Sequence, residues 1–322
     1  MRQPRSILSE LVWVHYLVGQ HVRISDANQQ PGGPAPISAT QIVMLGTGTP
    51  RPDPDRSGPA TVIVVNGRPY LFDCGPGIIR RAVAAYNKGV LAIGPAAVNL
   101  RTVFVTHLHA DHTVGYPDLI LTPWILGRKD PVDVYGPKGV EDMTRHVLSA
   151  WEVDIDNRLS GIDRLPASGC AVNAHEIDPG MFYKDENIRV SAFCVRHAGL
   201  ENAFGFRVET PHKTIVFSGD TAPTQSLLDN CHGCDVLIHE AYSQATYDKV
   251  APKWQAYRRE NHTSSTELAD IATRVRPRLL ILTHRVNIGA AMAVPDPEDV
   301  LLEEVRRLYK GNVVTGHDLD IF

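Results

Sequence analysis

The stretch THLHADH, residues 106–112, constrains this chain more than any other feature. It directly follows a β-branched and aromatic run, residues 102–105, that predicts a buried strand. Because side chains alternate along an extended chain, His107 and His109 leave the strand end on one face, and the aspartate and third histidine follow beyond a bend. Four polar loop residues in this pattern should arise by accident on the order of once in a thousand chains. The stretch therefore predicts a metal site, and its nitrogen and oxygen ligands suit Zn²⁺.

Length and composition indicate an ordinary soluble globular protein. The chain has 322 residues, of which 43% are apolar and 21% charged, enough for one large core or two coupled ones. The net charge of −4 argues against a general nucleic-acid binder, because surfaces that follow phosphates need an excess of Lys and Arg. The five cysteines are an odd number without a dense framework, which favours free thiols and a cytoplasmic location.

The first residues differ in character from the rest of the chain. Residues 7–18 are mostly apolar but too short to span a bilayer, and we expect a helix that packs on the body or on a partner, with no membrane span. The segment supports a signal peptide, and so a secreted or periplasmic location, only weakly. Residues 29–36, QQPGGPAP, predict a linker. We therefore expect an N-terminal extension over 1–39 and a catalytic domain over 40–322.

From Gln41 onward the pattern predicts two similar halves of strands and helices. The expected strands are QIVMLG, TVIVV and PYLFD in the first half and 188–193, 203–209 and 214–217 in the second. The expected helices are 77–88, 117–127 and a single long one over 140–159. Asp220 ends the second set of strands where Asp73 ends the first, which indicates a weak internal duplication.

His-x-His-x-Asp-His at a strand end resembles the signature of the metallo-β-lactamase fold superfamily, and the resemblance covers nearly the whole chain. Six more segments follow in the order that its tRNase Z and arylsulfatase branch uses: LGTGTP at 45–50, FDCG at 72–75, RHA at 196–198, SGDT at 218–221, HEA at 239–241 and LTH at 282–284. The resemblance implies an α/β fold, a four-layer αβ/βα sandwich with metals in the cleft between the sheet edges.

The resemblance also implies a dinuclear centre with ligands from both halves. The implied assignment is His107, His109 and His197 on one metal, Asp111, His112 and His284 on the other, and Asp220 between them. Two Zn²⁺ ions are the expected cofactors, with Mn²⁺ or Fe²⁺ as alternatives, and a hydroxide that bridges them would be the nucleophile. Asp111 then belongs to the catalytic set as well as to the ligands.

The segment HEA at 239–241 matches a tRNase Z motif that works with a downstream histidine, here His262. A Ser-x-x-Glu capping box starts a helix over 265–275, so His262 should stand beside a helix N-terminus, where an anionic ester is stabilised. The functional interpretation makes Glu240 orient His262 as a general acid. The alternative is a buried structural pair.

Departures from tRNase Z favour a smaller substrate. No Gly-rich or Lys-rich insertion resembles its tRNA-binding arm, and RVN at 285–287 differs from its usual Phe-Ser-x-Arg-Tyr. Four arginines are expected near the mouth of the site: Arg51, Arg56, Arg128 and Arg285. We therefore expect a homodimeric, arylsulfatase-like hydrolase of small anionic esters, either sulfate esters or phosphodiesters, with nucleic acid not favoured.

Three alternatives stay open. A tRNA 3′-processing endoribonuclease would bind tRNA in a salt-sensitive way. Lactonase or β-lactamase activity is disfavoured, because the segment after His197 lacks the features of those branches. A non-catalytic metal-binding module is disfavoured by the complete ligand set. The basic and aromatic segment 250–259 would either cover the pocket or present a solvated helix face.

Overall fold

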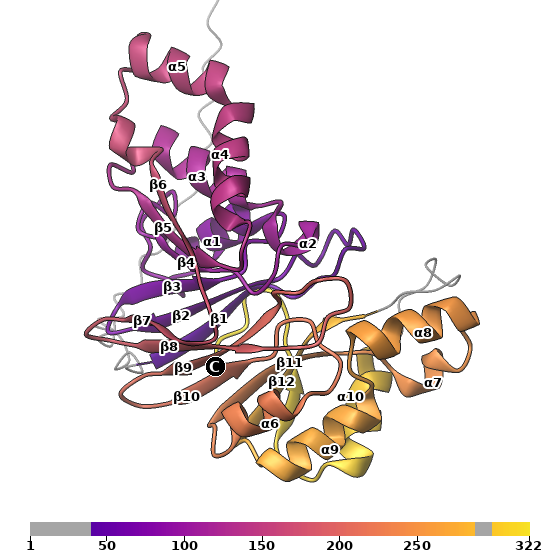
Figure 1. Ribbon diagram of the computed structural model, residues 1–322. Coiled ribbons are helices and arrows are strands. Elements are labelled where there is room, and N and C mark those ends of the chain that lie inside the picture. The colour runs from indigo at the N-terminus through magenta and orange to yellow at the C-terminus, as the bar shows by residue number, and fades with distance from the viewer. Residues whose placement is uncertain (1–39, 287–297) are drawn as a thin grey trace, which may run out of the picture. The chain divides into compact units, whose positions relative to one another are not determined.

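The computed structural model describes residues 40–286 and 298–322, and within them two β-sheets lie face to face with helices on their outer sides (Figure 1). The first sheet has the order β1 (Thr40–Gly46), β2 (Ala60–Val65), β3 (Arg68–Phe72), β4 (Thr102–Phe104), β5 (Val132–Gly136), β6 (Val172–Glu176). The second has the order β13 (Val313–Thr315), β12 (Leu279–Arg285), β11 (Val236–Ala241), β10 (Thr214–Phe217), β9 (Phe204–Glu209), β8 (Arg189–Cys194), β7 (Gly180–Lys184). The predicted N-terminal extension lies outside the described residues.

Helices complete the outer layers. Those beside the first sheet are α1 (Ile78–Asn87), α2 (Ala110–Thr113), α3 (Tyr116–Ile125), α4 (Val140–Ala150) and α5 (Glu152–Ser160), with a 3₁₀ turn at Ala167–Gly169. Those of the second half are α6 (Gln225–Cys231), α7 (Gln244–Tyr247), α8 (Pro252–Asn261), α9 (Ser265–Val275) and α10 (Glu298–Leu308). No helix in the described part of the chain is long and apolar enough to cross a membrane.

Three buried apolar clusters separate the layers and confirm the predicted αβ/βα sandwich. The middle cluster joins the two sheets, and in it Phe72 of the first sheet stacks on Phe217 of the second with ring centroids 4.4 Å apart. One outer cluster packs the first sheet against α1 and α3, with Trp124 fully buried. The other packs the second sheet against α6, α9 and α10. Each sheet is therefore apolar on both faces.

Most predicted elements are present, and the differences from the expectations include a divided helix, two missed edge strands and a cysteine pair. The single helix predicted over 140–159 is two, α4 and α5, because the backbone of Trp151 leaves the helical region. The edge strands β6 and β7 were missed, because they are largely exposed and lack the apolar alternation that marks a half-buried strand. Cys231 and Cys234 form a disulfide, so the expectation of free thiols holds only for Cys74, Cys170 and Cys194.

Arg128 lies in the core, so its predicted place at the mouth of the site is wrong. Pro123 inside α3 has no N–H to donate, and this leaves the carbonyl of Leu119 without its helical partner. The buried guanidinium of Arg128 donates to that carbonyl at 2.7 Å, and also to the carbonyls of Ile120 and Gly169. The guanidinium thus supplies hydrogen-bond donors to carbonyl groups of α3, including the one that Pro123 leaves without a partner.

Arg128→Met should lower the free energy of unfolding by about 3 kcal/mol, because it leaves buried carbonyls without donors. Urea denaturation of the purified protein measures this difference. Arg101→Gln is the matched control, since that arginine pairs with Asp130 at the surface and should change stability by less than about 1 kcal/mol. Equal losses in the two variants would contradict the structural role of Arg128.

Candidate metal centre

The predicted ligands lie close to strand ends or within the short helix α2. His107 and His109 follow β4, and His197 follows β8. Asp220 follows β10 after Gly219, whose φ of 60° lies in the left-handed region; a Cβ there would approach the carbonyl oxygen of Phe204 to 2.7 Å. The remaining three come from α2 and β12. Packing of the sheets therefore brings ligands from both halves together.

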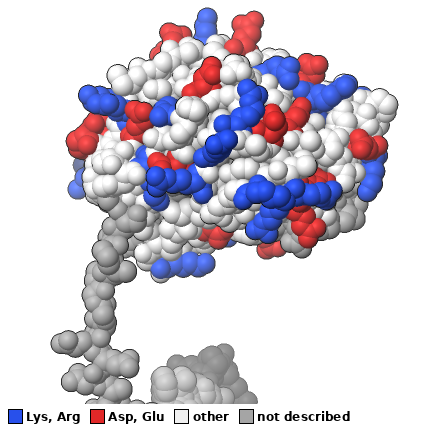
Figure 2. Space-filling model, turned by 90° about the horizontal axis from the view of Figure 1, so that it is seen from below, with Lys and Arg blue, Asp and Glu red and all other residues white. Residues whose placement is uncertain are grey.

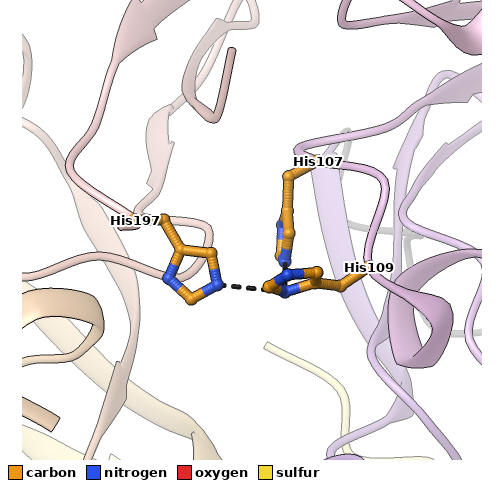
Figure 3. A group of neighbouring side chains, drawn as sticks. All are labelled: His107, His109 and His197. Atoms are coloured by element: carbon orange, nitrogen blue, oxygen red, sulfur yellow. Dashed lines mark hydrogen bonds between the residues drawn. The ribbon is translucent and has the colours of Figure 1, made fainter. Parts of the chain in front are cut away.

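One group consists of His107, His109 and His197, whose rings converge from opposite halves (Figure 3). Nδ1 of His109 lies 3.1 Å from Nε2 of His107 and 3.0 Å from Nε2 of His197. One nitrogen has a single lone pair or a single proton, so it cannot satisfy both neighbours at once. A cation that accepts all three lone pairs resolves this arrangement.

The second group consists of Asp111, His112 and His284. Nε2 of His284 lies 3.1 Å from Oδ2 of Asp111. Asp220 stands between the groups: its two oxygens lie 3.5 Å from the Nε2 atoms of His112 and His284, and it also approaches ligand atoms of His107 and His197. This is the position that a bridging carboxylate requires.

The electrostatics of the buried cluster also call for a cation. Burial lowers the pKa of His107 well below its usual range and that of His197 to about 4, so both rings offer free lone pairs at neutral pH. Burial works against charge on His112 too, but Asp220 and Asp73 raise its pKa well above the usual range. The carboxylates thus draw protons onto an imidazole, and a metal ion would replace those protons. The donor set therefore fits a divalent metal.

Three residues behind the ligands, none of them predicted as site residues, orient the imidazoles. Asp73 accepts from Nδ1 of His112 at 2.9 Å, the hydroxyl of Thr106 lies 3.0 Å from Nδ1 of His107, and the carbonyl of Asn261 lies 2.9 Å from Nδ1 of His197. Such contacts fix which ring nitrogen faces the metal. The only signal in the sequence was Asp73 after an apolar strand, and there it indicated a strand end.

Two residues of the cluster have a strained backbone. Asp73 has a φ of 58° and His284 a φ of 39°, both in the left-handed region that side chains rarely adopt. Asp73 compensates by accepting from the N–H and hydroxyl of Thr106 as well as from His112. Asp73 is thus held by the same hydrogen bonds that orient His112.

Glu240 and His262 lie together beside the ligands, as predicted. Nδ1 of His262 is 3.3 Å from Oε1 of Glu240, which also accepts the N–H groups of Thr221 and Thr263. Burial, and then Asp220, raise the pKa of Glu240 well above its usual range, and burial lowers that of His262 to about 4. His262 follows α8, and the predicted capping box of Ser264 and Glu267 starts α9.

A loop of residues 47–57, which we call the mouth loop, lines two cavities next to the cluster. One, of about 710 Å³, lies between the mouth loop, the start of α1 and Asp111. The other, of about 360 Å³, is lined by Arg51, Arg56 and Arg285 among others. Three of the four predicted arginines therefore do lie near the site. The larger cavity is therefore open to Asp111, one of the predicted ligands.

The chain is similar to known proteins in sequence. The model of the family described as "Beta-lactamase superfamily domain" matches residues 68–285 of this chain. A protein from Mycobacterium sp. (strain KMS) named Ribonuclease Z is 33% identical over 248 residues, which cover 76% of this chain and 83% of that protein. A Ribonuclease Z from Mycobacterium bovis (strain BCG / Pasteur 1173P2) is 29% identical over 283 residues, covering 87% and 96%.

Solved structures agree in fold. Human tRNase Z, short form, has a TM-score of 0.63 and 24% identity, covering 88% of this chain and 98% of that chain. The metallo-β-lactamase fold protein YhfI from Bacillus subtilis has a TM-score of 0.65 and 16% identity, covering 88% and 98%.

Asp220→Ala should remove more metal than loss of any single histidine, because it withdraws a ligand from both groups. We expect about two ions per chain in the native protein, fewer than one in this variant, and at least one in His109→Ala. Metal analysis after gel filtration measures the content. Asp229→Ala, at an exposed position on α6, is the control. Full metal content in Asp220→Ala would contradict the bridging position.

Proposed function

Since this chain belongs to the β-lactamase superfamily, we propose that it uses its metal centre to cleave phosphodiester bonds in RNA. Membership makes it a metal-dependent hydrolase. The choice of RNA is supported by relatives named Ribonuclease Z, one of them 33% identical. The observation that carries it on this chain is the buried pair of Glu240 and His262 beside the ligands. A tRNA precursor cleaved at its 3′ side is the favoured substrate.

The seven ligands would hold two divalent cations, with Zn²⁺ favoured because the set is rich in imidazole. When bound, these ions supply Lewis acidity and a water nucleophile at neutral pH. The protein's part is to keep the rings oriented through Asp73, Thr106 and Asn261. This support lets both halves of the sandwich present lone pairs to the same small volume.

His262 would deliver the proton that the departing oxygen needs. Glu240 holds Nδ1 of His262, which leaves Nε2 to face away from Glu240, in a ring that lies next to His197 and Asp220. The sugar oxygen released from RNA is a poor leaving group unless it is protonated. A pair that positions one transferable proton beside the ligands suits this leaving group better than it suits an activated ester.

The charge at the mouth supports an anionic substrate. Arg51 and Arg285 line the smaller cavity, where a phosphate next to the scissile bond would find guanidinium groups. On the face shown in Figure 2, Lys and Arg are interspersed with Asp and Glu. We therefore assign recognition of the RNA phosphates to the arginines of the mouth rather than to the face shown in Figure 2.

A small phosphodiester is the second candidate. The residues between His197 and Asp220 form only β9, β10 and their short connections, with no inserted arm that would bind a large RNA. The relatives' names favour RNA over the sulfate ester that the sequence suggested. A cytoplasmic location and a homodimer suit an RNA-processing enzyme and remain predictions.

The purified, metal-loaded protein should cleave a tRNA precursor with a 3′ extension and, more slowly, bis(4-nitrophenyl) phosphate. We expect 4-nitrophenyl sulfate and a β-lactam to be turned over at least about 100-fold more slowly than the phosphodiester, and chelator to abolish all turnover. Gel and absorbance assays of initial rates measure this order. Faster turnover of the sulfate would contradict the proposal, and cleavage of the small phosphodiester alone would favour the second candidate.

His262→Ala should lower cleavage of RNA by about 10² to 10⁴, because general acid catalysis is worth that much for an alkoxide leaving group. Turnover of bis(4-nitrophenyl) phosphate should change little, since nitrophenolate leaves without a proton. Metal content is measured in parallel and should stay unchanged. Equal losses on both substrates, or loss of metal, would mean that Glu240 and His262 are a structural pair.

A further inference from the structure

The mouth loop needs an anchor because it has little regular structure of its own. Its ends are joined by one backbone hydrogen bond, from the N–H of Gly48 to the carbonyl of Ser57 at 2.7 Å. Between them, Asp53 and Arg56 form an isolated bridge. The same loop lines both cavities beside the metal ligands. Its position therefore decides the shape of the entrance.

Asp318 holds both ends of the mouth loop at once. Its side chain is 4% exposed, and Oδ1 accepts from the N–H and the hydroxyl of Thr47 at 3.0 and 2.9 Å. Oδ2 accepts from the N–H of Ser57 at 2.8 Å and pairs with Nε of Arg81 on α1 at 3.1 Å. A single carboxylate thus joins the loop's first residue, its last residue and the neighbouring helix.

The segment that carries Asp318 is itself fixed to the first sheet. Leu319 donates its N–H to the carbonyl of Met44, and Ile42 and Phe322 exchange two backbone hydrogen bonds of 2.9 Å. The carbonyl of Gly316 accepts from Arg56 at 3.2 Å. Asp318 therefore acts from a rigid support, and its distance from every catalytic motif along the sequence hides this role.

We propose that Asp318 is a positioning residue for the substrate: it holds the mouth loop in the shape that receives the part of the RNA next to the scissile bond. This inference rests on the proposed function. The carboxylate of Asp318 contacts Thr47, Ser57 and Arg81 rather than the predicted ligands, so its effect would reach the reaction through the mouth loop. Loss of this contact should weaken binding of an extended substrate and leave the metal centre intact.

Asp318→Asn is the most specific variant, because it keeps the size of the side chain and replaces one of the two acceptor oxygens by an NH2 group. The amide oxygen can still accept from Thr47. The amide nitrogen would face the N–H of Ser57 and Nε of Arg81, which are donors themselves, so both of those contacts are lost. Asp320→Asn is the matched control, since that carboxylate lies two residues on and accepts from His317 rather than from the loop. Arg81→Gln tests the other side of the same anchor.

The experiment combines hydrogen exchange with kinetics on holoenzyme of known metal content. In Asp318→Asn we expect amides of residues 46–58 to exchange about tenfold faster and KM for the tRNA precursor to rise about tenfold, with kcat and the turnover of bis(4-nitrophenyl) phosphate nearly unchanged. Arg81→Gln should act in the same direction, and the double variant should be no worse than the stronger single one. Asp320→Asn should match the native protein in every measurement.

Unchanged exchange over 46–58, an equal fall in kcat on both substrates, or a loss of metal would overturn the inference. If the native holoenzyme cleaves neither phosphodiester, the proposed function fails and the substrate role of Asp318 fails with it. Even then, the exchange measurement decides separately whether this carboxylate anchors the loop.

Discussion

The packing of two sheets against one aromatic core is the constraint on which the rest of the structure depends. Phe72 and Phe217 belong to different halves, and their stacking fixes how far one set of strand ends lies from the other. His107 and His197 come from those two sets and meet around His109. Neither half alone offers a complete ligand group of this kind. The metal centre is thus a property of the interface between the sheets rather than of the motif at 106–112 alone.

The buried cluster also shows why stability and function compete at this edge. It places carboxylates of like charge and several imidazoles together out of water, and it keeps Asp73 and His284 in backbone conformations that cost energy. Asp73 offsets part of that cost by bonding Thr106 and His112. A bound cation would offset much of the remainder, so we expect metal and folded state to stabilise each other.

How much of this was predictable follows from the range of the interactions. Most of the strands and the motif at 106–112 are local patterns, so they could be predicted from the residues themselves. The sandwich and the ligands of the second half, His197, Asp220 and His284, followed only from the resemblance, because a single histidine or aspartate after a strand does not by itself indicate a metal. Arg128 was misplaced because its partner carbonyls are set by a helix end and a loop that only the fold brings together. Asp318 was missed because its contacts with Thr47 and Ser57 cross nearly the whole chain. An isolated aspartate gives no sign of such a contact.

The anchor of the mouth loop has a consequence for the order in which the protein matures. His284, the last metal ligand along the chain, is synthesised before Asp318. A growing polypeptide that has emerged from the ribosome only as far as His284 would carry all seven ligands while the entrance above them still lacked its carboxylate tether. Vectorial synthesis would therefore make all seven side chains available before the carboxylate that shapes the entrance.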